Sequence, residues 1–194
     1  YGIENSATVL DFDDHFERSA DVIVEIGFGN GASTWQMAKQ EPEKNFIGIE
    51  VHEPGVGHLL MALEENDVEN VRIVCDDAVE FLEKRIEPGS LAGIRIYFPD
   101  PWPKKRHHKR RIIQADFVEL LAKCMKPGGI LHLATDWQPF ADHVLEIMQD
   151  SAGFSNLSND GDYCDRPEWR PYTKYEQRGE RLGHEVRDLL YQRS

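Results

Sequence analysis

The chain has 194 residues, of which 40% are hydrophobic and 10% aromatic, enough to bury a core and to exclude wholesale disorder. Asp and Glu number 35 against 22 Lys and Arg, so the net charge is −13. A chain this acidic does not bind nucleic acid or anionic membranes by bulk attraction, and a polyanionic partner would need a local basic patch. No apolar run reaches the roughly 18 residues of a membrane-spanning helix.

The cysteine content indicates a reducing compartment. Three cysteines lie far apart without a CxxC pair, which is typical of free cytosolic thiols rather than of a disulfide framework or a zinc site. We therefore expect a cytoplasmic protein. The length favours one domain, residues 1–194, and because the sequence begins at Tyr1 rather than Met we expect an N-terminal segment to precede it.

Strand and helix patterns alternate along the chain. Short β-branched or apolar runs predict five strands, at residues 22–26, 46–49, 71–75, 91–98 and 130–134. Amphipathic runs between and after them predict helices at about 32–39, 56–63, 79–86, 111–125 and 140–148, and the Lys-Pro-Gly-Gly segment 126–129 is expected to end the fourth of these. This order predicts an α/β fold with a mainly parallel sheet, whose ligand sites lie beyond the carboxyl ends of the strands.

A glycine-rich turn follows the first predicted strand. Gly27, Gly29 and Gly31 allow sharp turns and bring backbone amides close to a ligand. Together with Ala32 they also satisfy the dinucleotide pattern GxGxxA, so the turn alone does not identify the ligand. Glu25 lies two residues before the first glycine, where a carboxylate would face the pyrophosphate of a dinucleotide. It would instead suit the ammonium group of a sulfonium amino acid, which favours S-adenosylmethionine over NAD.

Acidic residues also follow the next three strands. Glu50 is suited to bind a ribose diol, Asp77 to accept from an adenine amine, and Asp100 follows the fourth strand. Each of these taken alone could be a helix N-cap or a solvated loop carboxylate. Together with Glu25 they put four acids at neighbouring strand ends, which predicts a nucleoside site.

A basic run lies directly after the proline-rich segment 99–103. Residues 104–111 carry six Lys or Arg in eight positions, a defined positive patch for which phosphate is the natural partner. A solvated helix start is the alternative, although positive charge in a first helical turn opposes the helix dipole. His107 and His108 have no third ligand at suitable spacing, so we reject a metal site. Trp102 could equally pack as an anchor or stack on a base.

The C-terminal segment, residues 160–194, is expected to contact the substrate. Residues 166–176 interleave aromatic and basic side chains with two prolines, a composition that suits an extended segment over a flexible polyanion. A proline-rich connector whose aromatic side chains pack on the sheet is the alternative. From residue 166 onward, 7 basic residues stand against 5 acidic ones, so the charge balance becomes slightly positive.

Residues 98–111, FPDPWPKKRHHKRR, resemble the bacterial tRNA (guanine-N7)-methyltransferases. The resemblance extends over nearly the whole chain, through segments 25–29, 48–50, 134–137 and 173–176. It implies a class I methyltransferase fold, Rossmann-like, with a seven-stranded sheet in which the last two strands form a hairpin and one strand is antiparallel. It also implies transfer of a methyl group from S-adenosylmethionine to N7 of the variable-loop guanine of tRNA, at position 46, with S-adenosylhomocysteine as the product.

The resemblance also implies roles for individual residues. The residues that would hold the donor are Glu25, Gly27, Gly29, Gly31, Glu50, Asp77 and Asp100, and the catalytic acid would be Asp100. The residues that would meet the guanine substrate are Lys104, Asp136, Thr173, Lys174, Tyr175 and Glu176. The residues that would contact RNA are Arg106, His107, His108, Lys109, Arg110 and Arg111. The partner would be tRNA, and we expect a monomer that binds neither DNA nor membranes and holds no metal.

Three other functions fit parts of the sequence. A methyltransferase for another RNA base or a small molecule would share the donor-site acids, but exocyclic-amine enzymes typically lack such a basic run. A non-catalytic RNA-binding module on the same scaffold would have no use for Glu25 and Asp77. A nicotinamide oxidoreductase fits only the GxGxxA match, and we find no Tyr-x-x-x-Lys pair for hydride transfer.

Overall fold

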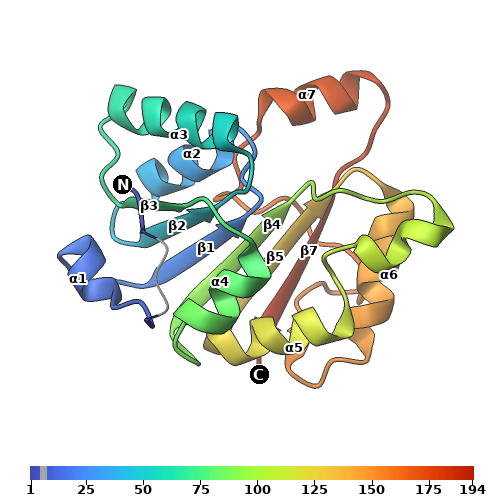
Figure 1. The fold of residues 1–194 in the computed structure, drawn as a ribbon. Helices are drawn as coiled ribbons and strands as arrows, with labels where there is room; N and C mark the ends of the chain where they lie inside the picture. Colours follow the sequence, from blue (N-terminus) through green and yellow to red (C-terminus); the bar gives the residue numbers. More distant parts are fainter. Residues whose placement is uncertain (5–7) are drawn as a thin grey trace.

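One seven-stranded sheet runs through the centre of the molecule (Figure 1), in the order β3-β2-β1-β4-β5-β7-β6. The computed structural model describes residues 1–4 and 8–194. The strands are β1 (Val22–Ile26), β2 (Asn45–Ile49), β3 (Val71–Val74), β4 (Leu91–Tyr97), β5 (Met125–Thr135), β6 (Phe154–Asn156) and β7 (Arg187–Arg193). Strands β1 to β5 pair in parallel, whereas β7 is antiparallel to both β5 and β6. This confirms the predicted fold class and its single antiparallel strand.

Helices cover both faces of the sheet (Figure 1). On one face lie α2 (Ala32–Gln40) and α3 (Glu53–Glu65), and on the other lie α4 (Ala78–Arg85), α5 (Ala115–Cys124) and α6 (Gln138–Gln149). A short α1 (Phe12–Phe16) precedes β1, and α7 (Lys174–Arg181) lies beyond the carboxyl ends of the central strands. Within the described residues, none of the helices has the length and apolar character needed to cross a membrane.

The central strands are buried on both faces, which explains their continuous apolar runs. In β1 every residue is buried; Val24 packs toward α4–α6, whereas Ile23 packs toward α2 and α3. The α2–α3 face also carries charge, because Glu25 on β1 stands beside Arg95 on β4, which stands beside His132 on β5. All three side chains are buried. This face of the sheet therefore holds a polar row inside an otherwise apolar core.

Among the predicted elements, the boundaries differ most in two places. The helix expected from residue 111 begins only at Ala115, and the basic run before it forms a separate 3₁₀-helix, η1 (Lys105–Arg110). Residues 126–129 do not separate a helix from a strand, because β5 starts at Met125 directly after α5. Gly128 has a positive φ of 81° there, and the β4–β5 register shifts beside it, so this part of β5 is irregular.

The C-terminal region also departs from expectation. Strands β6 and β7 are neighbours, as a hairpin requires, but residues 157–186 lie between them in the chain. Within that stretch, 174–181 is the helix α7 rather than a continuation of the extended segment expected at 166–176. Its side chains are almost all polar, so no apolar period indicated a helix. The side chain of Thr173 caps it by accepting from the amide of Glu176.

Candidate active site

Two adjoining cavities open at the carboxyl ends of β1 and β4. The larger has a volume of about 740 Å³ and the smaller about 430 Å³, and both are lined by Gly27 and Phe98. This is the edge of the sheet at which ligands of parallel α/β folds bind. The two cavities therefore define the region in which the predicted site residues have to be placed.

The glycine-rich turn between β1 and α2 lines the larger cavity, and its first glycine, Gly27, also lines the smaller one. Gly27, Gly29 and Gly31 have φ values of 71°, 59° and 76°, a left-handed backbone that other residues adopt only at a cost. The amide of Gly29 donates to Glu50 Oε2 at 2.9 Å, and Glu50 Oε1 accepts from the amides of Val51 and of the next residue. Glu50 therefore ties the end of β2 to the glycine-rich turn.

Gly55, which sequence analysis missed, supports the turn from the side of α3. A Cβ atom at this position would lie 2.0 Å from the carbonyl oxygen of Gly29, so only glycine lets α3 approach so closely. The available signal was Gly57 inside the helix predicted at 56–63 together with Gly55 immediately before it, since glycine is destabilising in a helix. A conformational cost of that kind indicates a packing constraint, and here the constraint is the turn.

Three of the four predicted donor-site acids line the smaller cavity, namely Glu50, Asp77 and Asp100. Asp77 is also the N-cap of α4, since its Oδ1 accepts from the amides of Val79 and Glu80 at 2.9 and 3.1 Å. The alternative interpretation of Asp77 as a helix N-cap is thus correct. It does not exclude a ligand, because both of these bonds use the same carboxylate oxygen.

Glu25 lies within its strand, whereas the other three acids follow the ends of theirs. It belongs to β1 itself, is only 2% exposed and lines the larger cavity. Its carboxylate accepts from the hydroxyls of Ser33 and Thr34 in the first turn of α2, the latter at 2.6 Å. Burial raises the pKa of Glu25, whereas these two hydroxyls and the charge of Arg95 lower it. The Glu25 carboxylate is thus a buried acceptor at the floor of the larger cavity.

The residues expected to meet guanine are divided by the structure. Thr173, Lys174 and Tyr175 line the larger cavity opposite the glycine-rich turn, and the ring of Tyr175 packs edge-on against Phe98, with centroids 5.2 Å apart. Glu176 follows them in the chain but is only 3% exposed. The larger cavity thus gathers Glu25 with residues 173–175, and Glu176 is buried behind its wall.

The other two predicted guanine contacts lie outside the lining of both cavities. Lys104 is exposed and immediately precedes η1. Asp136 follows β5, and its Oδ2 lies 3.0 Å from Nδ1 of His184, in the loop after α7. The α7 segment is therefore linked to the end of β5 through this contact.

The basic run is partly exposed and partly structural. Arg106, Lys109 and Arg110 are exposed, and the guanidinium of Arg110 lies 5.1 Å from the ring centroid of Trp102. Arg111 departs from the expectation of a phosphate-facing cation, because it is only 3% exposed and donates to the carbonyls of Pro101 and Pro139. It anchors the loop, and its position in the sequence gave no sign of this.

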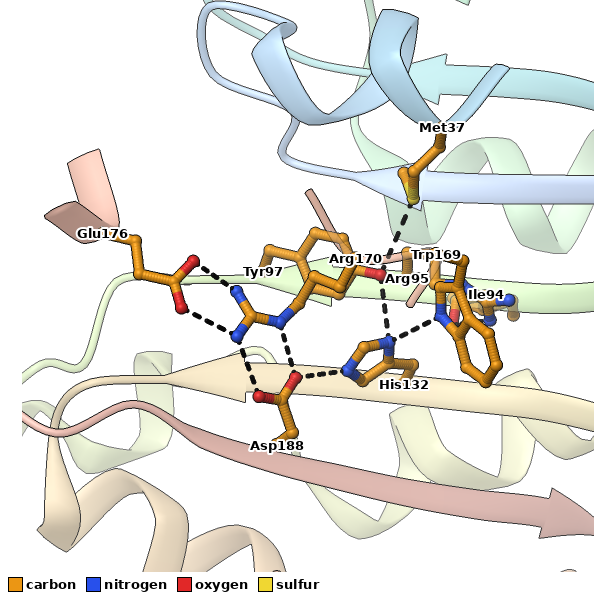
Figure 2. Close-up of polar contacts among 9 residues, drawn as sticks. All are labelled: Met37, Ile94, Arg95, Tyr97, His132, Trp169, Arg170, Glu176 and Asp188. Carbon is orange, nitrogen blue, oxygen red and sulfur yellow. Dashed lines mark hydrogen bonds and ion pairs between the residues drawn. The ribbon is translucent and has the colours of Figure 1, made fainter. Parts of the chain in front are cut away.

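A buried arginine in the lining of the larger cavity links α7 to the sheet. Figure 2 shows its contacts. Arg170 donates from Nη1 and Nη2 to the two oxygens of Glu176 at 2.7 and 2.9 Å. It also donates from Nε and Nη2 to the two oxygens of Asp188 on β7 at 2.6 and 2.9 Å. All three residues are at most 3% exposed. One guanidinium thus bridges two buried carboxylates through bidentate pairs, the strongest geometry for such contacts.

His132 on β5 continues this network (Figure 2). Its Nε2 lies 2.7 Å from Asp188 Oδ1, and its Nδ1 lies 3.1 Å from the indole nitrogen of Trp169 and 3.0 Å from the hydroxyl of Tyr97. An indole N–H can only donate, so Nδ1 is an acceptor and the ring proton is on Nε2, facing Asp188. Burial lowers the pKa of His132 to about 4. The imidazole is therefore a neutral donor at physiological pH.

Sequence analysis named none of these network residues except Glu176. Arg170 lay inside the segment singled out for its aromatic and basic composition, but nothing separated it from the neighbouring arginines. His132 is a single polar residue within the apolar strand segment 130–134, whereas Asp188, 56 positions later, follows Arg187 at the start of β7. An isolated polar residue in such a strand is the available signal, and it identifies no partner.

The depressed pKa of His132 makes stability pH-dependent. Unfolded histidine titrates near 6.5, whereas folded His132 titrates near 4, so between these values the unfolded state binds the extra proton. The free energy of unfolding should therefore fall by about 3 kcal/mol as pH drops from 6.5 to 4. Urea denaturation at stepped pH measures it. His132→Gln should lose most of this dependence and the exposed control His58→Gln should retain it; equal slopes in His132→Gln and wild type would contradict the assignment.

Comparison with known proteins agrees with this architecture. Residues 19–189 match the family model described as "Putative methyltransferase". The tRNA (guanine-N(7)-)-methyltransferase of Alcanivorax borkumensis is 52% identical over 193 residues, covering 100% of this chain and 81% of that protein. The enzyme of the same name from Cronobacter sakazakii is 54% identical over 192 residues, covering 99% of this chain and 80% of that protein.

A more distant likeness concerns the fold alone. The crystal structure of the 16S rRNA methyltransferase KamB superposes with a TM-score of 0.66 at 15% identity, covering 94% of this chain and 92% of that one. Its methyltransferase fold agrees with the sheet order and the helix layers described above. With more than half of its residues identical over essentially its whole length, the chain belongs to the tRNA (guanine-N(7)-)-methyltransferase family.

Proposed function

We propose that this protein transfers a methyl group from S-adenosylmethionine to N7 of a guanine in the variable loop of tRNA, at position 46. One observation carries the proposal. Glu50, Asp77 and Asp100 share a cavity with Arg110 of the basic run, and this cavity adjoins the larger one whose wall includes residues 173–175. Groups suited to a nucleoside, to a purine and to phosphate thus meet at one edge of the sheet.

The donor fits the chemistry of these side chains. The buried carboxylate of Glu25 suits an ammonium group, Glu50 suits ribose hydroxyls and Asp77 suits an amine, while the left-handed glycines leave the turn free of side chains. A dinucleotide would place phosphates among these carboxylates, which would repel them. When bound, S-adenosylmethionine supplies an electrophilic methyl group on a positively charged sulfur.

The reaction requires little proton transfer by the protein. Guanine N7 carries a free lone pair and no proton, so it needs no general base. What remains is alignment of the reacting groups, an effect that can contribute roughly 7–11 kcal/mol at best. We assign to Asp100, which lines the smaller cavity, the stabilisation of the positive charge that spreads over the purine as the methyl group arrives.

Recognition of the base and of the RNA backbone falls to different residues. Asp136, with a side chain 20% exposed, offers an acceptor for the N1–H and N2–H edge of guanine. Arg106, Lys109 and Arg110 are exposed and offer cations to phosphates. The buried Arg111 supports the loop that carries them. The partner that these groups fit is tRNA.

The function is tested by identifying the methylated nucleoside. We expect the purified protein, incubated with unmodified tRNA transcript and methyl-labelled S-adenosylmethionine, to place label in 7-methylguanosine after complete digestion. A transcript in which the variable-loop guanine is replaced by adenine should take up no label. Label in another nucleoside, or no label although the donor binds, would contradict the proposal.

Asp100 should matter for turnover more than for donor binding. We expect Asp100→Asn to lower kcat by roughly 10²- to 10³-fold, as removal of one electrostatic stabiliser does elsewhere, because the amide keeps the shape but loses the charge. Donor affinity, measured by calorimetry with S-adenosylhomocysteine, should change far less. Glu119→Gln, an exposed change on α5, is the matched control. Wild-type turnover in Asp100→Asn would remove Asp100 from the mechanism.

The exposed cations of the basic run should set the salt dependence of tRNA binding. The logarithm of the binding constant falls as the logarithm of the salt concentration rises. Changing Arg106, Lys109 and Arg110 to Gln should make this slope shallower, by about 0.7 for each lost single-strand phosphate contact. Titrations of labelled tRNA at several salt concentrations measure the slope. The exposed residues Lys39, Lys84 and Lys123, changed to Gln, give the same change in net charge and should leave the slope nearly unchanged. Equal slopes in the two triple variants would show that the basic run does not contact RNA.

A further inference from the structure

The buried Arg170 network is not used by the chemistry described above. Of the five N–H donors of the Arg170 guanidinium, four are bonded to Glu176 and Asp188. Glu176 in turn uses both carboxylate oxygens on Arg170 and is 3% exposed. The residue that the family resemblance assigns to guanine therefore has its acceptor oxygens occupied by another side chain.

We propose that Arg170 is a positioning residue for methyl transfer, and that Glu176 acts through Arg170 rather than on the guanine. Arg170, Glu176 and Asp188, which we call the arginine clamp, hold the wall of the larger cavity against the sheet in the shape that receives the base. This inference rests on the proposed function. It deepens that function by separating residues that touch the guanine from those that place them.

The clamp closes a short loop at both ends. Arg170 and Glu176 flank residues 171–175, and their bidentate pair joins the two ends of this five-residue segment. Every residue of the segment lines the larger cavity, as Arg170 itself does. The loop is further ordered by the cap that Thr173 forms on the amide of Glu176. The shape of this wall is thus set by contacts within the protein.

The clamp also connects the loop to the strand end that carries Asp100. The ring of Phe98, two residues before Asp100, packs edge-on against Tyr175, and the Arg170 guanidinium lies 5.9 Å from its centroid. Phe98 has a positive φ of 50°, a strained backbone for a bulky residue that the surrounding contacts have to maintain. A displaced loop would therefore move Phe98 and, through it, the neighbouring Asp100.

The anchor of the clamp is on the sheet. Asp188, on β7, accepts from Arg170 and from the neutral imidazole of His132 on β5. Trp169, adjacent to Arg170 in the chain, donates to the other ring nitrogen of His132. Withdrawing Glu176 toward a substrate would leave a buried guanidinium with one partner fewer, a costly arrangement. The geometry thus favours a fixed Glu176.

The test compares Glu176→Gln with Glu168→Gln, the same change at an exposed position two residues before Arg170. Hydrogen exchange is first measured in the protein alone. The bonded amides that report on the loop are those of residue 170, which donates to Pro167, and of residues 176 and 177, which donate to Thr173. Because the clamp orders the loop in the free protein, Glu176→Gln should raise the exchange rates of these amides about tenfold or more, and Glu168→Gln should not. Unchanged exchange in Glu176→Gln would overturn the clamp and favour direct contact with the guanine.

Kinetics on the same variants provide the second readout. At saturating donor, Glu176→Gln and Arg170→Lys should each lower kcat on tRNA by roughly a hundredfold, the cost of misplacement by about 1 Å, with little change in donor affinity. Their effects should not add in the double variant, since both open the same loop. Additive losses, or a parallel loss of donor affinity, would overturn the proposal.

A variant that does not fold and a failure of the proposed function can each be recognised. If Arg170→Lys does not accumulate as folded protein, Glu176→Gln against Glu168→Gln decides the question alone, because a glutamine retains the size of the side chain. If wild type methylates no tRNA, the proposed function fails. The exchange comparison in the free protein still decides whether the clamp orders the loop.

Discussion

The bidentate pairs between one buried guanidinium and two buried carboxylates are the interaction on which the candidate site depends. Burying a charge costs free energy that ion pairing and hydrogen bonding offset, and Arg170, Glu176 and Asp188, each at most 3% exposed, provide these partners for one another. Because these residues come from the segment before α7, from α7 and from β7, their mutual pairing fixes a region that has little apolar surface of its own. The wall of the larger cavity is thus ordered by charge rather than by packing.

The two faces of the sheet contribute differently to the molecule. The face toward α4, α5 and α6 is apolar and supplies most of the buried core, whereas the face toward α2 and α3 carries the polar row. Along that row Arg95 lies between Glu25 and the neutral His132, and the clamp follows beyond His132. The row and the clamp together hold three carboxylates and two guanidinium groups, which leaves one negative charge in excess beside the cavities when all five are ionised. Such a field suits a ligand that carries positive charge.

Sequence patterns predicted the five parallel strands β1 to β5 and the acidic residues at their ends, because β-branched runs and glycine-rich turns act locally, but they did not locate β6 and β7. Asp77 and Glu50 were found in this way, since their positions follow from strand ends alone. The clamp could not be found, because Arg170, Asp188 and His132 acquire their meaning only from partners on other strands. Helix α7 was not predicted because almost all of its side chains are polar, so the sequence shows no apolar period there. The burial of Arg111 was not predicted because it depends on contacts with the carbonyls of Pro101 and Pro139, which the sequence of the basic run does not indicate.

The position of β7 in the sheet has a consequence for how the protein is made. A ribosome produces β6 before β7, yet β7 lies between β5 and β6. During translation β5 therefore presents an unpaired edge, and β6 has no neighbour until residues 187–193 emerge from the exit tunnel. Asp188 arrives with that strand, and Arg170 lacks one of its two carboxylates until then. A nascent chain can thus build the apolar face early, while the wall of the larger cavity is completed only when β7 is inserted.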